Sequence, residues 1–109
     1  MTFDEYQKLT KETAIYPAIG HGMVYPTMGL VNEAGEVAGK VKKIFRDHGG
    51  ILSDTHKEDI SKELGDVLWY VSQVAAEINV SLSEIASENI KKLQSRKKRG
   101  ALKGDGDNR

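Results

Sequence analysis

Four carboxylates occur in the sequence as two pairs with the same spacing. Glu33 and Glu36 are three residues apart, and Glu63 and Asp66 repeat that spacing. Side chains three residues apart lie on one face of a helix, so each pair presents its two carboxylates together. In an antiparallel helical hairpin, the residue numbers of any two residues that lie side by side add up to the same total. Glu36 with Glu63 and Glu33 with Asp66 both add up to 99. The spacing therefore predicts that the four acids converge on one place.

Clustered carboxylates beside apolar residues limit the chemistry of that place. Each charge repels the others and loses hydration, so some of the acids would be protonated at neutral pH unless a cation neutralised them. A site made only of carboxylate oxygens suits a hard divalent ion, Mg²⁺ first and Mn²⁺ second, and Mg²⁺ commonly also binds substrate phosphates. The four acids thus predict a magnesium site for a phosphate substrate. The alternative is a hydrated acidic surface whose partners are Lys40 and Lys62.

The elements that position these acids are expected to be helices. Apolar residues recurring at steps of three and four predict helices over about residues 2–14, 27–46, 53–79 and 81–98. Both prolines fall in residues 15–27, which are expected to form a loop that ends at Thr27, the predicted N-cap of the second helix. Thr55 and Glu58 have capping-box spacing at the start of the third helix. The pattern predicts an all-α bundle of about four helices whose central antiparallel hairpin carries the metal site.

The composition restricts the remaining classes of function. The chain has 109 residues, 39% apolar and 29% charged, which is typical of one folded domain. It has no cysteine, which excludes thiolate metal sites and cysteine nucleophiles. No apolar run reaches the roughly 20 residues that span a bilayer, and the first residues lack the apolar core of a signal peptide. We therefore expect a cytoplasmic protein with no membrane partner, and oligomerisation is expected to complete its small core.

The net charge of zero hides an uneven distribution along the chain. Residues 1–90 carry eight basic and fourteen acidic side chains, a balance of −6, whereas residues 91–109 carry eight basic and two acidic ones, a balance of +6. An acidic main body argues against nucleic acid as a partner. Residues 1–99 are predicted to form the domain, and the small, polar residues 100–109 are predicted to be a disordered tail.

The arrangement of the acids resembles that of a known family. Glu33-x-x-Glu36, followed after 26 residues by Glu63-x-x-Asp66, is similar to the signature of the MazG-like, all-α nucleoside triphosphate pyrophosphohydrolases. Three strings agree with it in order and spacing: GLVNEAGEVAGKVKK at 29–43, KELGDVLWYV at 62–71 and ENIKKLQSR at 88–96. The resemblance implies hydrolysis of (deoxy)nucleoside triphosphates to monophosphate and pyrophosphate, Mg²⁺ held by the four acids, and a homodimer or homotetramer.

Further residues are predicted to act on the substrate. Those expected to bind it are Lys40, Lys43, Tyr70, Asn89, Lys92 and Arg96. The two lysines share the helix face of Glu36, where they could neutralise phosphates, and Tyr70, four residues after Asp66, could stack on the base or donate to a phosphate. The last three form one stripe on the fourth helix, and a triphosphate needs more positive charge than one metal ion supplies. Glu36 or Glu63 is the predicted base that activates water.

Other features leave alternatives open. Trp69 lies on a different face from Asp66 and is expected in a helix–helix or subunit interface. The three histidines are scattered, none at the E-x-x-H spacing of di-iron bundles, and there is no G-x-x-x-x-G-K-[ST] phosphate-binding loop. The alternative functions are a phosphoribosyl-ATP pyrophosphohydrolase, a non-catalytic helical interaction module, and nucleic-acid binding through residues 91–99.

Overall fold

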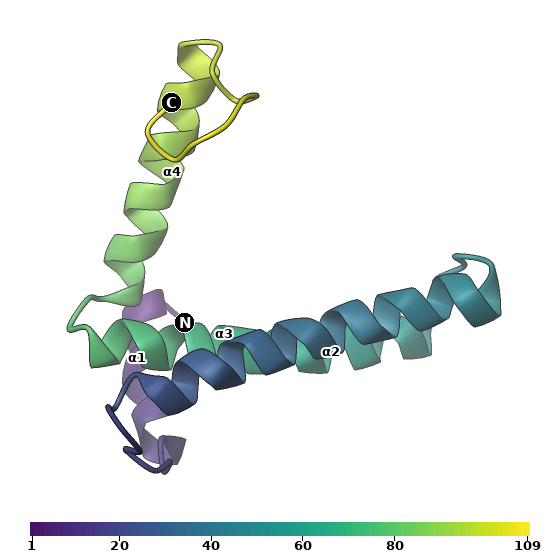
Figure 1. Ribbon diagram of the computed structural model, residues 1–109, viewed down its shortest axis with the longest axis horizontal. Helices are drawn as coiled ribbons and strands as arrows, with labels where there is room; N and C mark the ends of the chain where they lie inside the picture. Colours follow the sequence, from purple (N-terminus) through teal and green to yellow (C-terminus); the bar gives the residue numbers. More distant parts are fainter.

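The protein is all-helical, as the sequence predicts. The computed structural model describes residues 1–109. Its elements are α1 (Phe3–Thr10), the 3₁₀ turn η1 (Lys11–Thr13), α2 (Val24–His48), α3 (Asp54–Glu77) and α4 (Leu82–Lys98). Helices α2 and α3 form a long antiparallel hairpin, α1 lies against its open end, and α4 leaves that end as a separate arm (Figure 1). The predicted hairpin is therefore present, and it is the element that carries the acidic residues.

Helix α2 begins three residues earlier than predicted. Its first residue is Val24, so Thr27 lies inside the helix and is not its N-cap. Pro26 is the third residue of the helix, where its missing N–H costs little because the first turn has no intrahelical acceptor for that group. The helix continues to His48 and ends at Gly49, whose φ of 61° is the left-handed conformation that favours glycine. Pro26 thus belongs to the first turn of α2 and not to the loop that precedes the helix.

Helix α3 starts with a different capping pair from the predicted one. The hydroxyl of Ser53 accepts a hydrogen bond from His56 N, and Ser53 N donates to His56 Nδ1. The predicted pair, Thr55 and Glu58, lies within the helix instead. A histidine can replace the usual Glu or Gln of this motif because its Nδ1 lone pair is also an acceptor. At the other end, Asn79 has a left-handed φ of 59°, which confirms the predicted termination there.

Polar contacts fasten α1 to the open end of the hairpin. Thr10 is buried, and its hydroxyl lies 3.0 Å from that of Ser72 on α3. Gln7 donates to the carbonyl of Val80 and accepts from Leu82 N, so its amide holds the turn between α3 and α4. These bonds fix the place where the α4 arm begins.

An aromatic cluster closes the loop between η1 and α2. The rings of Tyr16 and Tyr25 stack with centroids 5.5 Å apart, and Tyr16 also meets the edge of Trp69 at 6.3 Å. The hydroxyl of Tyr16 donates to Glu77 Oε1 at 2.6 Å. Burial, together with this bond and the charge of Glu77, raises the pKa of Tyr16 to about 12. The loop is therefore tied to the far end of α3.

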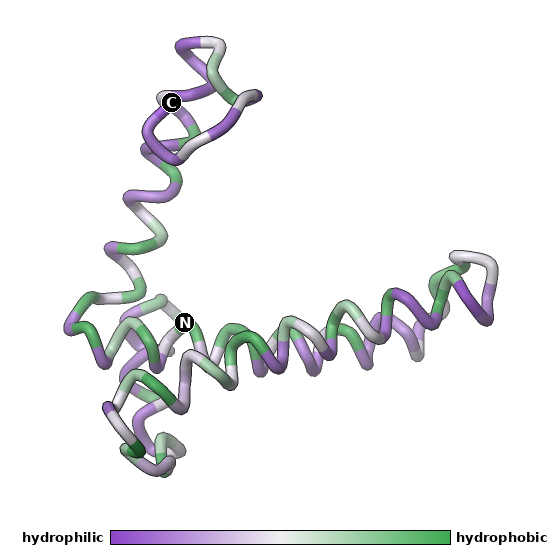
Figure 2. Tube along the Cα trace, in the orientation of Figure 1, coloured by the Kyte–Doolittle hydropathy of each residue, from purple (hydrophilic) through white to green (hydrophobic).

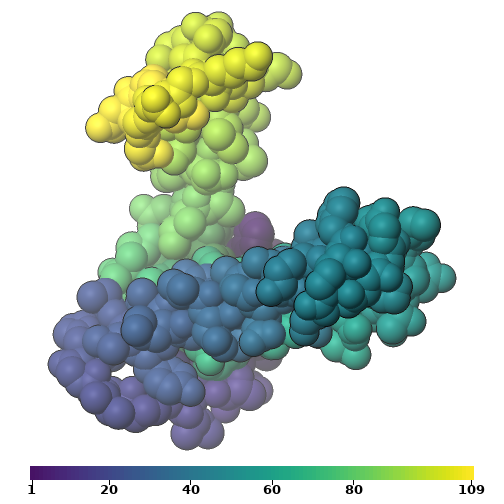
Figure 3. Space-filling view, turned by 45° about the vertical axis from the view of Figure 1, so that its right-hand side comes forward, coloured from purple at the N-terminus to yellow at the C-terminus, as the bar shows by residue number.

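The single chain has an open shape with a small core. Only 8 of its 109 residues are buried, and its radius of gyration is 16.8 Å, against about 13 Å for a compact chain of this length. Apolar residues recur along both hairpin helices (Figure 2), and the α4 arm stands apart from the hairpin in the space-filling view (Figure 3). Residues 100–109, expected to be disordered, fold back along α4 in this structure. No helix combines the length and apolar composition needed to cross a membrane.

Candidate metal centre

Three of the four predicted acids meet between the hairpin helices. One carboxylate oxygen each from Glu33 on α2 and from Glu63 and Asp66 on α3 lies within 4.8 Å of the others. Glu33 and Glu63 are half-buried, and Asp66 is exposed. Ligand oxygens about 2.1 Å from a Mg²⁺ ion lie about 3–4 Å from each other, so small side-chain movements would suffice to surround one ion. The donor set and its spacing fit a hard divalent cation.

Glu36 lies at the edge of this cluster, on the exposed side of α2. The residues of α2 that face α3 are Glu33, Val37, Lys40 and Ile44, all half-buried or buried. At about 100° per residue, Glu36 lies about 60° from Glu33 and about 40° from Lys40 around the helix, at the solvent-exposed edge of that face. Its charge still contributes to raising the pKa of Glu33, so the two carboxylates remain neighbours.

Lys40 occupies the position opposite Glu63. Its Nζ lies 3.5 Å from Glu63 Oε1. Glu63 therefore has a lysine as a neighbour in addition to the carboxylates of the cluster.

The surroundings of Glu33 oppose its negative charge. Partial burial raises its pKa above the usual 4.5, and the charge of Asp66, the hydrogen bond and charge of Glu63 and the charge of Glu36 raise it further. Clustered carboxylates show this behaviour when no cation compensates them. A cation in the cluster would favour the ionised form of Glu33, so the site is electrostatically suited to bind one.

Tyr70 borders the acidic cluster. Its ring lies over Gly29, where a Cβ atom would collide with it, and it packs edge-on against Trp69 at 5.0 Å. Burial raises the pKa of Tyr70, and a neighbouring tyrosine and Glu33 raise it further. Trp69, expected in an interface, packs on η1 and donates to Thr13 Oγ1 at 2.9 Å. Gly29 thus provides the space that places the Tyr70 ring beside the acids.

The other predicted substrate residues are not near the cluster within one chain. Asn89, Lys92 and Arg96 lie on α4, which points away from the hairpin (Figure 1). Lys92 Nζ lies 2.8 Å from Asp107 Oδ1, and Arg96 donates to the carbonyl and the carboxylate of the same aspartate. The tail therefore occupies the basic stripe in this structure.

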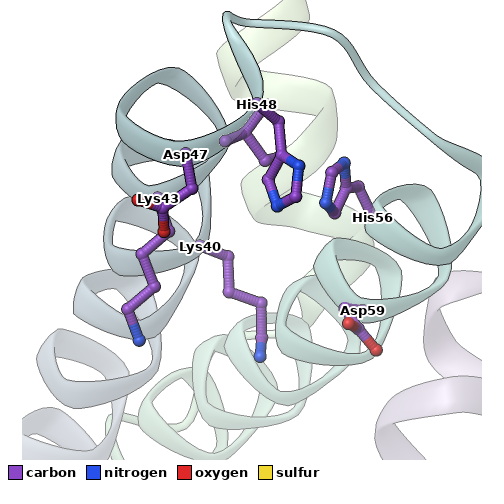
Figure 4. A pocket seen from close by; sticks show the side chains of 7 residues that line it. Lys40, Lys43, Asp47, His48, His56 and Asp59 are labelled. Carbon is purple, nitrogen blue, oxygen red and sulfur yellow. The ribbon is translucent and has the colours of Figure 1, made fainter.

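Side chains at the closed end of the hairpin gather where sequence reasoning placed no site. His48 ends α2, His56 lies in the first turn of α3, and their ring centroids are 4.8 Å apart (Figure 4). Lys43, a predicted substrate residue, lines the same place. The spacing carried only a weak signal for this pair, since the numbers of the two histidines total 104, five more than the 99 shared by the pairs of acids.

Comparison with known proteins assigns the chain to a family. Residues 26–101 match the MazG nucleotide pyrophosphohydrolase domain, and this segment includes all four predicted metal ligands. The chain belongs to the MazG family. It is 51% identical to the Gene 37 protein of Mycobacterium phage L5 over 114 aligned residues, which span the whole of both chains. No solved structure matches the chain.

Membership of the MazG family gives the activity class and the kind of substrate. The class is nucleotide pyrophosphohydrolase, and the implied substrate is a nucleoside triphosphate. The family typically depends on a divalent metal, and the acidic cluster supplies a place for one.

Proposed function

We propose that the protein hydrolyses (deoxy)nucleoside triphosphates to the monophosphate and pyrophosphate in a Mg²⁺-dependent reaction. The supporting observation is the cluster of Glu33, Glu63 and Asp66 within 4.8 Å on the hairpin of a MazG domain. Carboxylate oxygens are the donors that Mg²⁺ prefers, and Mn²⁺ suits the same set. Glu36, which lies beside Glu33, is proposed as the fourth ligand.

The residues around the cluster have different proposed roles in hydrolysis. A bound divalent ion would neutralise charge on the phosphate oxygens. Lys40 and Lys43 add point charges for the phosphates, and Tyr70 contacts the base or a phosphate. Glu36 or Glu63 accepts a proton from the attacking water, whose oxygen bonds to phosphorus as the bond between the α- and β-phosphates breaks. Pyrophosphate is the leaving group, and no covalent intermediate is needed.

A second copy of the chain brings the residues of α4 into this proposal. Asn89, Lys92 and Arg96 stand away from the hairpin of their own chain, so we propose a homodimer or homotetramer in which they reach a partner's substrate. The open shape of the chain supports an oligomer. Met28, Val31 and Phe45 on α2 are each 67% exposed, and an exposed apolar surface of this kind is typical of an interface.

Product identification with a nucleotide panel tests the proposed reaction. The purified protein is incubated with Mg²⁺ and each ribo- and deoxyribonucleoside triphosphate, and with phosphoribosyl-ATP, and the products are followed by phosphorus NMR. We expect monophosphate and pyrophosphate from at least one nucleoside triphosphate. Release of orthophosphate with a nucleoside diphosphate would contradict the proposal, and cleavage of phosphoribosyl-ATP alone would favour the biosynthetic alternative.

A further inference from the structure

The closed end of the hairpin holds a cleft of about 240 Å³ between the last turns of α2 and the first turns of α3. Lys40, Lys43 and His48 line it from α2, and His56 and Asp59 line it from α3 (Figure 4). Its volume is sufficient for an anion the size of a diphosphate. It lies outside the acidic cluster, so it calls for its own explanation.

The charges around this cleft leave cationic groups available to an occupant. Asp47, one of its two acids, is engaged by Arg46, whose Nε and a terminal nitrogen donate to the two carboxylate oxygens at 2.8 and 2.9 Å. Asp59, the other acid, lies 3.9 Å from Lys62 Nζ. Arg46 lowers the pKa of Asp47, and the charges of His48 and Lys43 lower it further, but Lys43 forms no salt bridge within 4.0 Å. Each acid therefore has a cationic partner outside the cleft, and Lys43 has no direct salt-bridge partner inside it.

The hydrogen bond at the start of α3 decides between an anion and a metal ion as the occupant. Ser53 N donates to His56 Nδ1 at 3.2 Å, so this nitrogen carries a lone pair and the proton of the neutral ring lies on Nε2. An Nε2–H group can donate to an oxyanion. To bind a metal through Nε2, the ring would need its proton on Nδ1, and the bond from Ser53 would be lost. The capping bond thus favours an anionic ligand.

Lys40 connects this cleft to the acidic cluster. Its Nζ lies 3.5 Å from Glu63 Oε1, and the same side chain lines the cleft. His56 precedes Glu63 by seven residues, or about 10 Å along α3. The cleft therefore begins where the cluster ends and extends away from it for about the length of a polyphosphate.

We propose that the cleft is an oxyanion site that receives the terminal phosphates of the substrate, the part that leaves as pyrophosphate, with His48 and His56 donating to it beside Lys40 and Lys43. This inference rests on the proposed function, because it takes a nucleoside triphosphate as the substrate. The same chemistry could hold free inorganic phosphate, and the experiment separates the two sources.

Titration calorimetry with pyrophosphate in metal-free buffer tests the cleft without reference to catalysis. The variants are His48→Ala and His56→Glu, since Glu at this position keeps the capping box while it places a negative charge in the cleft. The control is Lys57→Ala, which removes an exposed cation that pairs with Asp54 outside the cleft. We expect both histidine variants to bind pyrophosphate at least 10-fold more weakly than wild type, the control to bind within twofold, and inorganic phosphate to bind more weakly than pyrophosphate.

Three results would overturn the cleft assignment. The first is that the wild type does not bind pyrophosphate. The second is that both histidine variants bind pyrophosphate as tightly as the wild type does. The third is that inorganic phosphate binds to the wild type as tightly as pyrophosphate. Thermal melts show whether each variant is folded, and a matching melt for His56→Glu makes its result decisive. Hydrolysis that is lost in Glu63→Gln but unchanged in the histidine variants would leave the proposed function standing and reject the cleft alone. If the wild type binds pyrophosphate but hydrolyses no nucleotide, the oxyanion site stands and the proposed function is rejected.

Discussion

At the scale of single residues, the charge of Glu33 is opposed by three neighbouring carboxylates. Its raised pKa has burial as its largest cause, followed by the charge of Asp66 and the hydrogen bond with Glu63. A carboxyl whose pKa is raised by folding contributes stability below its usual value of 4.5 and loses it as the pH rises through the folded value. At neutral pH and without a cation, the ionised cluster therefore reduces the free energy of unfolding.

Replacing Glu33 with glutamine should remove this destabilisation and so increase the free energy of unfolding at neutral pH. In EDTA at neutral pH, Glu33→Gln should melt at a higher temperature than wild type, and the difference should disappear as the pH falls below about 4.5. Mg²⁺ should raise the melting temperature of wild type by several degrees and that of the variant much less, because ligand binding to the folded state stabilises it. Thermal melts with and without Mg²⁺ measure both effects, with the exposed Glu58→Gln on α3 as the control. An equal Mg²⁺ shift in Glu33→Gln and wild type would exclude Glu33 as a ligand.

Residue types and spacing predict most of the acidic cluster, because carboxylates three residues apart share a helix face. They predicted the meeting of Glu33 with Asp66 and Glu63. The exposed orientation of Glu36 could not be read from its spacing, since the inner face of α2 is set by packing against α3 through Val37 and Ile44. Its role as a ligand stays a prediction.

At the scale of elements, the hairpin depends on close approach of α2 and α3 at one glycine. A Cβ on Gly29 would collide with the Tyr70 ring, whereas a Cβ on Gly35 would meet nothing within 4 Å. The first glycine is needed for packing, and the second only weakens the helix.

Alanine substitutions at these two glycines should therefore have opposite effects. Gly29→Ala should destabilise the protein by about 1–3 kcal/mol, the usual cost of overpacking, and should raise the KM for the nucleotide because Tyr70 is displaced. Gly35→Ala should stabilise it by about 0.5–1 kcal/mol, since alanine is the better helix former. Denaturant unfolding and steady-state kinetics measure both effects. Destabilisation of equal size in the two variants would contradict the assigned packing role of Gly29.

The helices were predictable, and three of them begin within one residue of the predicted start, but the first residue of α2 and the capping pair of α3 were not predicted. Pro26 indicated a loop from its usual behaviour, although the first turn of a helix accepts it. Thr55 and Glu58 matched a capping motif, but Ser53 and His56 form that motif two residues earlier in the chain. Local motifs compete at helix starts, and the packing of the hairpin selects between them.

At the scale of the whole molecule, the single chain buries only 8 of its 109 residues and leaves many large apolar side chains exposed. The α4 arm contributes little to the hairpin's core and carries its basic stripe away from the acidic cluster (Figure 1). The direction of this arm could not be predicted, because it is set by the Gln7 amide at the turn after α3 and not by any periodic pattern.

Sedimentation equilibrium tests the proposed assembly. We expect a species of two or four times the chain mass of 12.0 kDa, and we expect Val31→Lys on the exposed face of α2 to shift it toward the single chain. Lys97→Ala, an exposed change on α4, is the control. A wild-type mass of one chain at all concentrations would contradict the oligomer and leave Lys92 and Arg96 without a route to the substrate.

Mg²⁺-dependent pyrophosphate release by wild type and by Glu63→Gln tests most directly whether the acidic cluster carries out the hydrolysis. Glu63 contributes to the acidic cluster and contacts Lys40, so its carboxylate should be required for hydrolysis. Loss of a group that only supports a metal ligand costs about 10–100-fold, and loss of a ligand should cost about 100-fold or more. We predict such a fall for Glu63→Gln and near wild-type release by Glu58→Gln on the same helix. Undiminished pyrophosphate release by Glu63→Gln would show that hydrolysis does not depend on the acidic cluster.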